Sequence, residues 1–328
     1  MSSITPERPD VKSVADETKP STGKTTCTVI VNRESGTVKD VWSADFKNDL
    51  QKVLEEGGWE PRICEVQGQE IESTVKEAKR AKVGAIIAGG GDGTTNSIVS
   101  MMLGSDTPLG ILPFGTLNLA PRDLGSPLDP LEAAASLRPD AVKKIDVLKI
   151  GGHACLCMAV FGFYPKLLSR SESFHGRNWL RKFTGLAAVF FKAFTRGRSL
   201  KLSVQDVDSG TVRNLSSRML FLIPGTYEDN LGIIPKRNSL EAGMCSIVYS
   251  EHRSRWSLFR LVCNFLMGRS REDPDLDIAY GSQFEIKARG RKKLLVAIDG
   301  ELKHVRTPVD VALEREALRV LYHEKSDS

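Results

Sequence analysis

A glycine-rich segment, GGGDGT at residues 89–94, joins an apolar run at residues 84–88 to a run of helical periodicity that begins at Thr94. Such a loop suits an anion, because glycine lets the backbone approach the ligand and the first N–H groups of the helix point toward it. The segment has no lysine, so it does not match the P-loop, and its glycine spacing differs from the dinucleotide fingerprint. It therefore predicts a phosphate site that contains Asp92, with an ordinary helix start and a turn aspartate as the simpler alternative.

A pair of carboxylates ends the apolar segment LLVAIDGE, at Asp299 and Glu301. Transfer of a phosphoryl group to an alcohol needs a group that takes the proton of the attacking hydroxyl, and a positioned carboxylate can do this. An Asp-Gly pair after a strand is also a common hairpin turn. Taken alone, these residues favour the hairpin; the catalytic interpretation needs further support.

The residues before position 148 alternate between strand-like and helix-like segments. The expected strands are 26–32, 61–66, 84–88 and 108–113, and the expected helices are 43–57, 72–82, 94–103 and 130–137. This alternation is typical of a parallel sheet with helices on both faces. Ligands bind beyond the carboxyl ends of such strands. We therefore expect the loops NRESG (32–36), GGGDGT and FGTLN (114–118) to share one edge of the sheet.

The residues after position 148 are mostly strand-like, with turn signals at 206–210 and 299–300 and helices expected near 177–196 and 255–267. The expected fold class is a doubly wound α/β N-terminal domain followed by a β-rich C-terminal sandwich or barrel. The expected division of the chain is a disordered polar tail at 1–24, a nucleotide-binding domain at 25–148 and a β-rich domain at 149–328.

The composition excludes several classes of protein. A net charge of +5 over 328 residues does not point to a nucleic-acid partner. The six cysteines lack metal-binding spacing and are expected to be small buried residues in a reducing compartment, and the five histidines form no zinc motif. We find no secretory signal and no apolar run near the ~18 residues of a membrane span. The expected location is the cytoplasm.

Several motifs, taken in order, resemble the diacylglycerol kinase catalytic-domain family, which includes bacterial lipid kinases and sphingosine kinases. GGGDGTTN is followed about 20 residues later by LGILPFGTLN, and FGFYPKLL and IDGE resemble signatures of the second domain. NRESG resembles the first loop of the family at Asn32, Ser35 and Gly36. The resemblance runs from about Thr26 to Leu321. It implies a first domain similar to phosphofructokinase and NAD kinase, with ATP as donor and a lipid hydroxyl as acceptor.

The resemblance also implies a role for individual residues. Glu301 would be the general base, with Asp299 as its support. Asp92 would act on Mg²⁺ bound with ATP, which explains a carboxylate in a phosphate loop that lacks lysine. The implied ATP site consists of Asn32, Ser35, Gly36, Gly90, Gly91, Asp92, Gly93, Thr94, Gly115, Thr116 and Asn118.

The acceptor lipid would be reached at a membrane surface. The segment 177–196 places aromatic side chains on one helical face and basic side chains on the other, as in helices that lie on anionic bilayers. A helix packed on the core with a solvated basic face explains the same pattern. We expect a peripheral association with the membrane. The sequence does not decide between a monomer and a homodimer.

Four positions depart from the family pattern. Leu119 replaces a residue that is often polar in the family. Arg33 replaces a proline in the first loop, Pro121 falls where a helix usually continues, and Ala242 replaces an aspartate that helps to hold a structural Mg²⁺ in some bacterial members. That metal is in doubt unless Glu241 substitutes. The alternatives are a kinase for a sphingoid base, phosphatidylglycerol or NAD, and an inactive module that binds nucleotide or lipid. The sequence leaves the identity of the lipid open.

Overall fold

The computed structural model describes most of the chain. The described residues are 23–116, 118–162, 199–226, 239–250, 260, 264 and 273–322. Several expectations lie outside them: the tail up to residue 22, the FGFYPKLL motif beyond Gly162, the helix at 177–196, most of the helix at 255–267, and Cys263.

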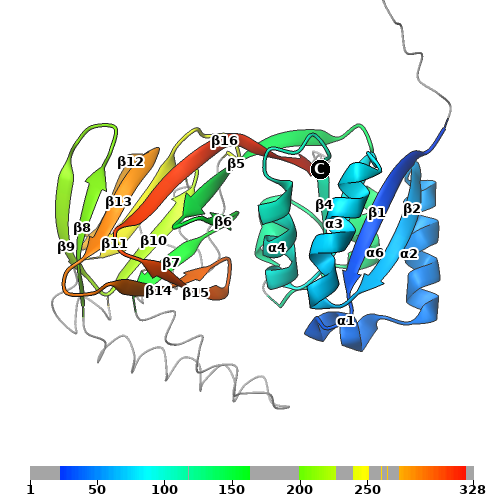
Figure 1. The fold of residues 1–328 in the computed structure, drawn as a ribbon, viewed down its shortest axis with the longest axis horizontal. Helices are drawn as coiled ribbons and strands as arrows, with labels where there is room; N and C mark the ends of the chain where they lie inside the picture. Colours follow the sequence, from blue (N-terminus) through cyan, green and yellow to red (C-terminus); the bar gives the residue numbers. More distant parts are fainter. Residues whose placement is uncertain are drawn as a thin grey trace, which may run out of the picture.

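The first lobe, on the right of Figure 1, is built on a parallel sheet. Its strands lie in the order β2 (Trp59–Val66), β1 (Thr25–Asn32), β3 (Ala85–Gly90) and β4 (Leu109–Pro113). All residues of β3 and β4 are buried. Near-continuous apolar runs are typical of parallel strands that helices cover on both faces.

Helices cover both faces of this sheet and pack into separate cores. On one face lie α1 (Gly36–Val41), α2 (Ala44–Glu56) and α6 (Pro130–Ser136). On the other lie α3 (Ile71–Arg80), α4 (Asp92–Met102) and α5 (Leu119–Asp123), with the short 3₁₀ helix η1 (Gly68–Glu70) leading into α3. The expected doubly wound α/β arrangement is therefore confirmed.

The second lobe is antiparallel and consists of two packed sheets. One contains β16, β13, β8 and β9, and the other has the order β12-β11-β10-β7-β14-β15. A large apolar core lies between them, which confirms the expected β-rich domain. The strands are β5 (Val142–Ile150), β6 (His153–Cys155), β7 (Ala159–Gly162), β8 (Leu200–Asp206), β9 (Val212–Ser217), β10 (Met219–Pro224), β11 (Cys245–Ser250), β12 (Leu276–Gly281), β13 (Gln283–Ala288), β14 (Lys293–Ile298), β15 (Glu301–Arg306) and β16 (Val309–Leu321).

The long last strand connects the two lobes, as the red ribbon in Figure 1 shows. β16 pairs antiparallel with β13 and β5, and near its end Val320 pairs with Leu109 of β4. Leu318 and Val320 are buried in the core of the first lobe. The expected boundary at residue 148 thus falls inside β5, and the sheet continues through both lobes.

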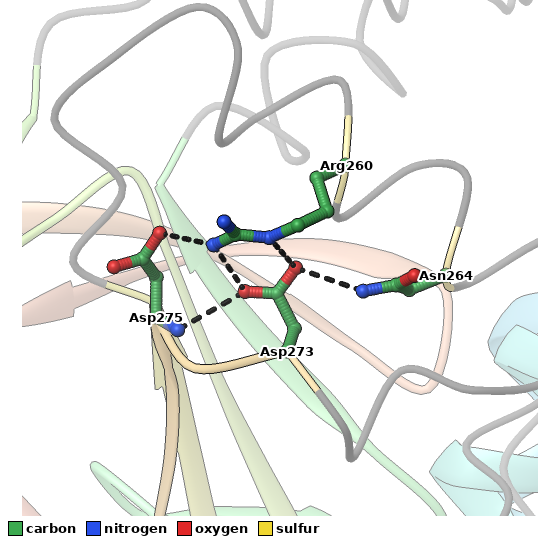
Figure 2. Close-up of polar contacts among 4 residues, drawn as sticks. All are labelled: Arg260, Asn264, Asp273 and Asp275. Atoms are coloured by element: carbon green, nitrogen blue, oxygen red, sulfur yellow. Dashed lines mark hydrogen bonds and ion pairs between the residues drawn. The ribbon is translucent and has the colours of Figure 1, made fainter.

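A polar cluster fixes residues 260 and 264 to the segment before β12 (Figure 2). The buried carboxylate of Asp273 accepts hydrogen bonds from Arg260 Nε at 3.2 Å and from Asn264 Nδ2 at 3.2 Å. Arg260 Nη2 also lies 2.6 Å from Asp275 Oδ2. A buried carboxylate is costly unless its charge is paired and hydrogen-bonded. This cluster therefore meets the requirement for burying Asp273.

Two cysteines bear out the expectation of small buried side chains. Cys27 and Cys245 are buried in the two lobes, and burial raises the pKa of each thiol to about 12. Both are therefore protonated near neutral pH. Separately, none of the helices in the described ranges has the length and apolar character needed to cross a bilayer.

Candidate active site

Three loops of the first lobe leave the sheet side by side. In the register of the parallel strands Val31 pairs with Gly89, and Gly89 and Gly90 pair with Leu112 and Pro113. The strands β1, β3 and β4 therefore end at the same edge. The loops at 32–36, 89–94 and 114–118 share this edge, as expected.

The glycine loop leads directly into α4. Gly91 is the N-cap of this helix and, as a glycine, makes no side-chain cap hydrogen bond. A Cβ on Gly90 would lie 2.6 Å from the side chain of Thr94, so this position has no room for a larger residue. The N–H groups of the first turn and the positive end of the helix dipole favour an anion here.

The first loop is tied to α4 by a buried hydrogen bond. Asn32 donates from Nδ2 to Thr94 Oγ1 at 2.8 Å, and its Oδ1 accepts from the backbone N–H of Glu34 at 3.0 Å. Ser35 lies close to the glycine loop, because a Cβ on Gly91 would be 3.1 Å from its Oγ. Asn32 therefore connects the end of β1 to the first turn of α4, the helix that follows β3.

Replacing Thr94 with valine tests this link. Thr94→Val removes the acceptor of the buried Asn32 amide and leaves its donor unsatisfied, which costs about 1–3 kcal/mol. We expect the free energy of unfolding in urea to fall by this amount. Thr95→Val is the matched control, because Thr95 is equally buried and makes no side-chain hydrogen bond among the described residues. Equal losses in both variants would contradict the link.

The loop after β4 is closed by Asn118. This residue adopts a left-handed conformation (φ 49°), and its Oδ1 accepts from the N–H of Gly115 at 2.6 Å. A Cβ on Gly115 would lie 2.8 Å from Oδ2 of Asp92, so the carboxylate of the glycine loop rests against this loop. The preceding Phe114 is fully buried and packs edge-on against Trp42 and Phe46. Thr116 is exposed at the tip of the loop.

Glu301 reaches the glycine loop at residues 89–94 from the other lobe. It is the first residue of β15, opposite Ile298 of β14, and its side chain is about one-third exposed. A Cβ placed on Gly93 would collide with Oε1 of Glu301. The carboxylate therefore lies directly against the first turn of α4, where the sequence predicts the phosphate site.

Asp299 has a different environment from Glu301. Its buried carboxylate accepts from the backbone N–H groups of Leu156, Cys157 and Met158 at 2.7, 2.8 and 2.9 Å. Burial raises the pKa of Asp299, and these hydrogen bonds oppose the shift. Asp299 and Gly300 both have positive φ, 47° and 88°, as a two-residue hairpin requires. The two interpretations of this segment are therefore compatible, because the hairpin turn at Asp299 and Gly300 places Glu301 at the start of β15.

Lys303 is a residue of this site that the sequence analysis missed. It lies two residues after Glu301 on β15, and its Nζ is 2.8 Å from Oε2 of Glu301. Alternate residues of a strand lie on the same face, so the spacing in ELK could have indicated the pair.

Two of the departures from the family pattern, Arg33 and Pro121, have local explanations. Arg33 forms an ion pair with Glu65, which Lys47 also contacts at 2.9 Å; Lys47 and Arg33 hold the pKa of the Glu65 carboxyl below its usual range. Pro121 lies in the first turn of α5, where a helix needs no N–H donor. Next to Ala242, Glu241 lies 3.3 Å from Lys143.

The metal-binding capacity of the site is small. Across the part of the chain that the structure describes, no three His, Cys, Asp or Glu side chains are grouped closely enough to hold a metal ion. A cation at the glycine loop would therefore need ligands from a bound phosphate in addition to Asp92. This arrangement fits a metal that enters with a nucleotide.

Comparison with known proteins finds one family model and several relatives that are similar to this chain. The model of the diacylglycerol kinase catalytic domain matches residues 26–150. The diacylglycerol kinase of Bacillus subtilis is 26% identical over 280 residues, which are 83% of this chain and 88% of that protein. A Pseudomonas fluorescens protein named probable lipid kinase YegS-like is 33% identical over 142 residues, 42% of this chain and 46% of its own length.

Solved structures share the whole fold. A Bacillus anthracis diacylglycerol kinase structure has a TM-score of 0.63 and 19% identity, covering 92% of this chain and 97% of that chain. A second structure from the same organism has a TM-score of 0.69 and 20% identity, with 93% and 98% covered. At this identity the likeness shows that both lobes and their connection have the same architecture.

Proposed function

We propose that this chain, in which residues 26–150 match the model of the diacylglycerol kinase catalytic domain, transfers the γ-phosphate of ATP to the hydroxyl group of a diacylglycerol-like lipid. The observation that carries the proposal is the contact between Glu301 of the second lobe and Gly93 of the glycine loop. This contact puts a carboxylate beside the helix N-terminus that suits a phosphate.

The nucleotide would lie along the edge that the three loops share. The N–H groups at the start of α4 would receive its phosphates, and Gly90 and Gly91 would let the backbone come close. Asn32 and Asn118 would keep the neighbouring loops in place through the hydrogen bonds described above. Mg²⁺ bound with ATP would neutralise charge on the phosphate oxygens, and Asp92 would help to hold it.

The reaction needs only one proton acceptor from the protein. The lipid hydroxyl oxygen forms a bond to the γ-phosphorus, while the bond between this phosphorus and the oxygen that bridges to the β-phosphate breaks. The hydroxyl proton passes to the Glu301 carboxylate, and ADP leaves with the bridging oxygen. Asp299 does not take part directly; its hydrogen bonds to residues 156–158 hold the turn that presents Glu301.

The acceptor determines where the chain acts. A diacylglycerol-like alcohol resides in a bilayer, so the enzyme must meet it at a membrane surface. We propose a peripheral association on the cytoplasmic side, where ATP is available. The segment 177–196, with its aromatic and basic residues, is the expected contact.

A panel of acceptors tests the proposal. The chain is incubated with ATP labelled at the γ-phosphate, Mg²⁺ and one acceptor at a time: diacylglycerol, monoacylglycerol, phosphatidylglycerol, sphingosine or ceramide in mixed micelles, and NAD without detergent. We expect labelled product with diacylglycerol or a close analogue. Transfer to NAD alone would contradict the lipid assignment. Binding of ATP without transfer to any acceptor would favour an inactive binding module.

A further inference from the structure

A positive charge lies next to the carboxylate of Glu301. The ammonium group of Lys303 is 2.8 Å from Oε2, while Oε1 of the same carboxylate lies against Gly93 at the start of α4. The Lys303 side chain is about one-third exposed, so it is neither buried in the core nor fully solvated. One carboxylate thus separates this ammonium group from the predicted phosphate site.

The loops of the first lobe offer little positive charge to a triphosphate. The segments 32–36, 89–94 and 114–118 contain no lysine. Their one arginine, Arg33, is engaged by Glu65, which Lys47 also contacts. Kinases and related enzymes place a lysine or arginine on the transferred phosphate, because negative charge must be stabilised there. In this chain a suitable cation comes from the opposite lobe.

We propose that Lys303 binds the γ-phosphate of ATP and so supplies, from β15, the charge that the glycine loop lacks. A lysine suits this role, since its ammonium is a compact charge with three donors on a flexible stem. It can keep Glu301 in place in the free protein and turn to the phosphate when ATP binds. The inference rests on the proposed function, because it requires ATP as the donor.

Two simpler roles for Lys303 make different predictions. β15 is an edge strand of its sheet, and lysines on edge strands discourage pairing with other chains. Lys303 could also serve only as an ion-pair partner that orients Glu301. In neither case does Lys303 contact a phosphate, so its loss should not change the affinity for ATP relative to ADP once Glu301 is replaced by glutamine and no unpaired carboxylate faces the nucleotide. A contact with the γ-phosphate should change that ratio, because ADP has no γ-phosphate.

The experiment compares binding of ATP and ADP, each with Mg²⁺, to the full chain without lipid. In the Glu301→Gln background, we expect Lys303→Met to weaken ATP binding by roughly 10- to 100-fold, the range for a hydrogen bond between charged groups, and to leave ADP binding within about twofold. Lys303→Arg should recover most of the ATP affinity. The matched control is Lys293→Met at the open end of the same hairpin, where Lys293 pairs with Arg306; it should change neither affinity.

The outcomes separate this inference from the proposed function. If the wild-type chain binds neither nucleotide, both are wrong. If it binds ATP and Lys303→Met leaves the ratio of ATP to ADP affinity unchanged in the Glu301→Gln background, the role of Lys303 is wrong and the proposed function stands. An equal loss for both nucleotides would also overturn the role, because it would indicate a general disturbance of the site.

Discussion

We expect Glu301→Gln to lower kcat for phosphoryl transfer by about 10²–10⁴-fold, the range for loss of a general base. Glutamine has nearly the same shape as glutamate and can keep the contact with Gly93, but it cannot accept the hydroxyl proton. The affinity for ATP should stay within about threefold of the wild-type value, because the proton acceptor is needed only in the reaction. Steady-state rates with saturating lipid and a separate measurement of ATP binding test both parts.

Glu314→Gln is the matched control for this prediction. Glu314 is also a strand glutamate in an ion pair, 2.6 Å from Lys149, and it lies on β16. Its replacement should leave kcat within about twofold, because a single exposed ion pair contributes little. If the Glu301→Gln enzyme has the wild-type kcat, Glu301 is not the general base.

Asp299→Ala should have the largest effect on stability. The substitution leaves the buried N–H groups of Leu156 and Cys157 and the partly buried N–H group of Met158 without their acceptor. Each buried donor without a partner costs about 1–3 kcal/mol, so we expect a loss of about 3–5 kcal/mol in the free energy of unfolding. Urea denaturation followed by circular dichroism measures this loss.

Two further variants make the stability prediction specific. Asp299→Asn keeps one acceptor oxygen but presents an amide donor to one of the three N–H groups, so its loss should be intermediate. Asp310→Ala replaces an exposed aspartate on β16 and should stay within about 0.5 kcal/mol of the wild type. A loss for Asp299→Ala no larger than that for Asp310→Ala would contradict a structural role for its hydrogen bonds.

Much of the first lobe follows from the sequence. The apolar runs at 26–32 and 84–88 predict buried strands, because they are short, rich in β-branched residues and bounded by glycine or polar loops. Parallel strands end at one edge, so the three loops could be placed together without coordinates. The structure confirms this part of the prediction.

Contacts between distant segments could not be predicted in the same way. Gly93 and Glu301 are about 208 residues apart, and no local pattern indicates that their lobes meet there; only the family resemblance suggested a shared site. The return of β16 to β4 and the hydrogen bonds of Asp299 to residues 156–158 are also products of the tertiary fold. Lys303 is different, since strand alternation alone places it beside Glu301.

A double-mutant cycle between Gly93 and Glu301 tests the central claim, that residues of the two lobes form one catalytic site. Gly93→Ala should lower kcat by about 10²-fold, because its Cβ displaces the Glu301 carboxylate. Glu301→Ala should lower kcat by about 10³-fold. In the double variant the carboxylate is already absent, so the glycine substitution has nothing left to displace.

The measurement is kcat for transfer of labelled γ-phosphate to diacylglycerol in mixed micelles, for the wild type, both single variants and the double variant. We expect the double variant to be about as active as Glu301→Ala alone, since residues that act as a unit have non-additive effects. If the two losses instead multiply to about 10⁵-fold, Gly93 and Glu301 act independently and the account of a shared site is wrong.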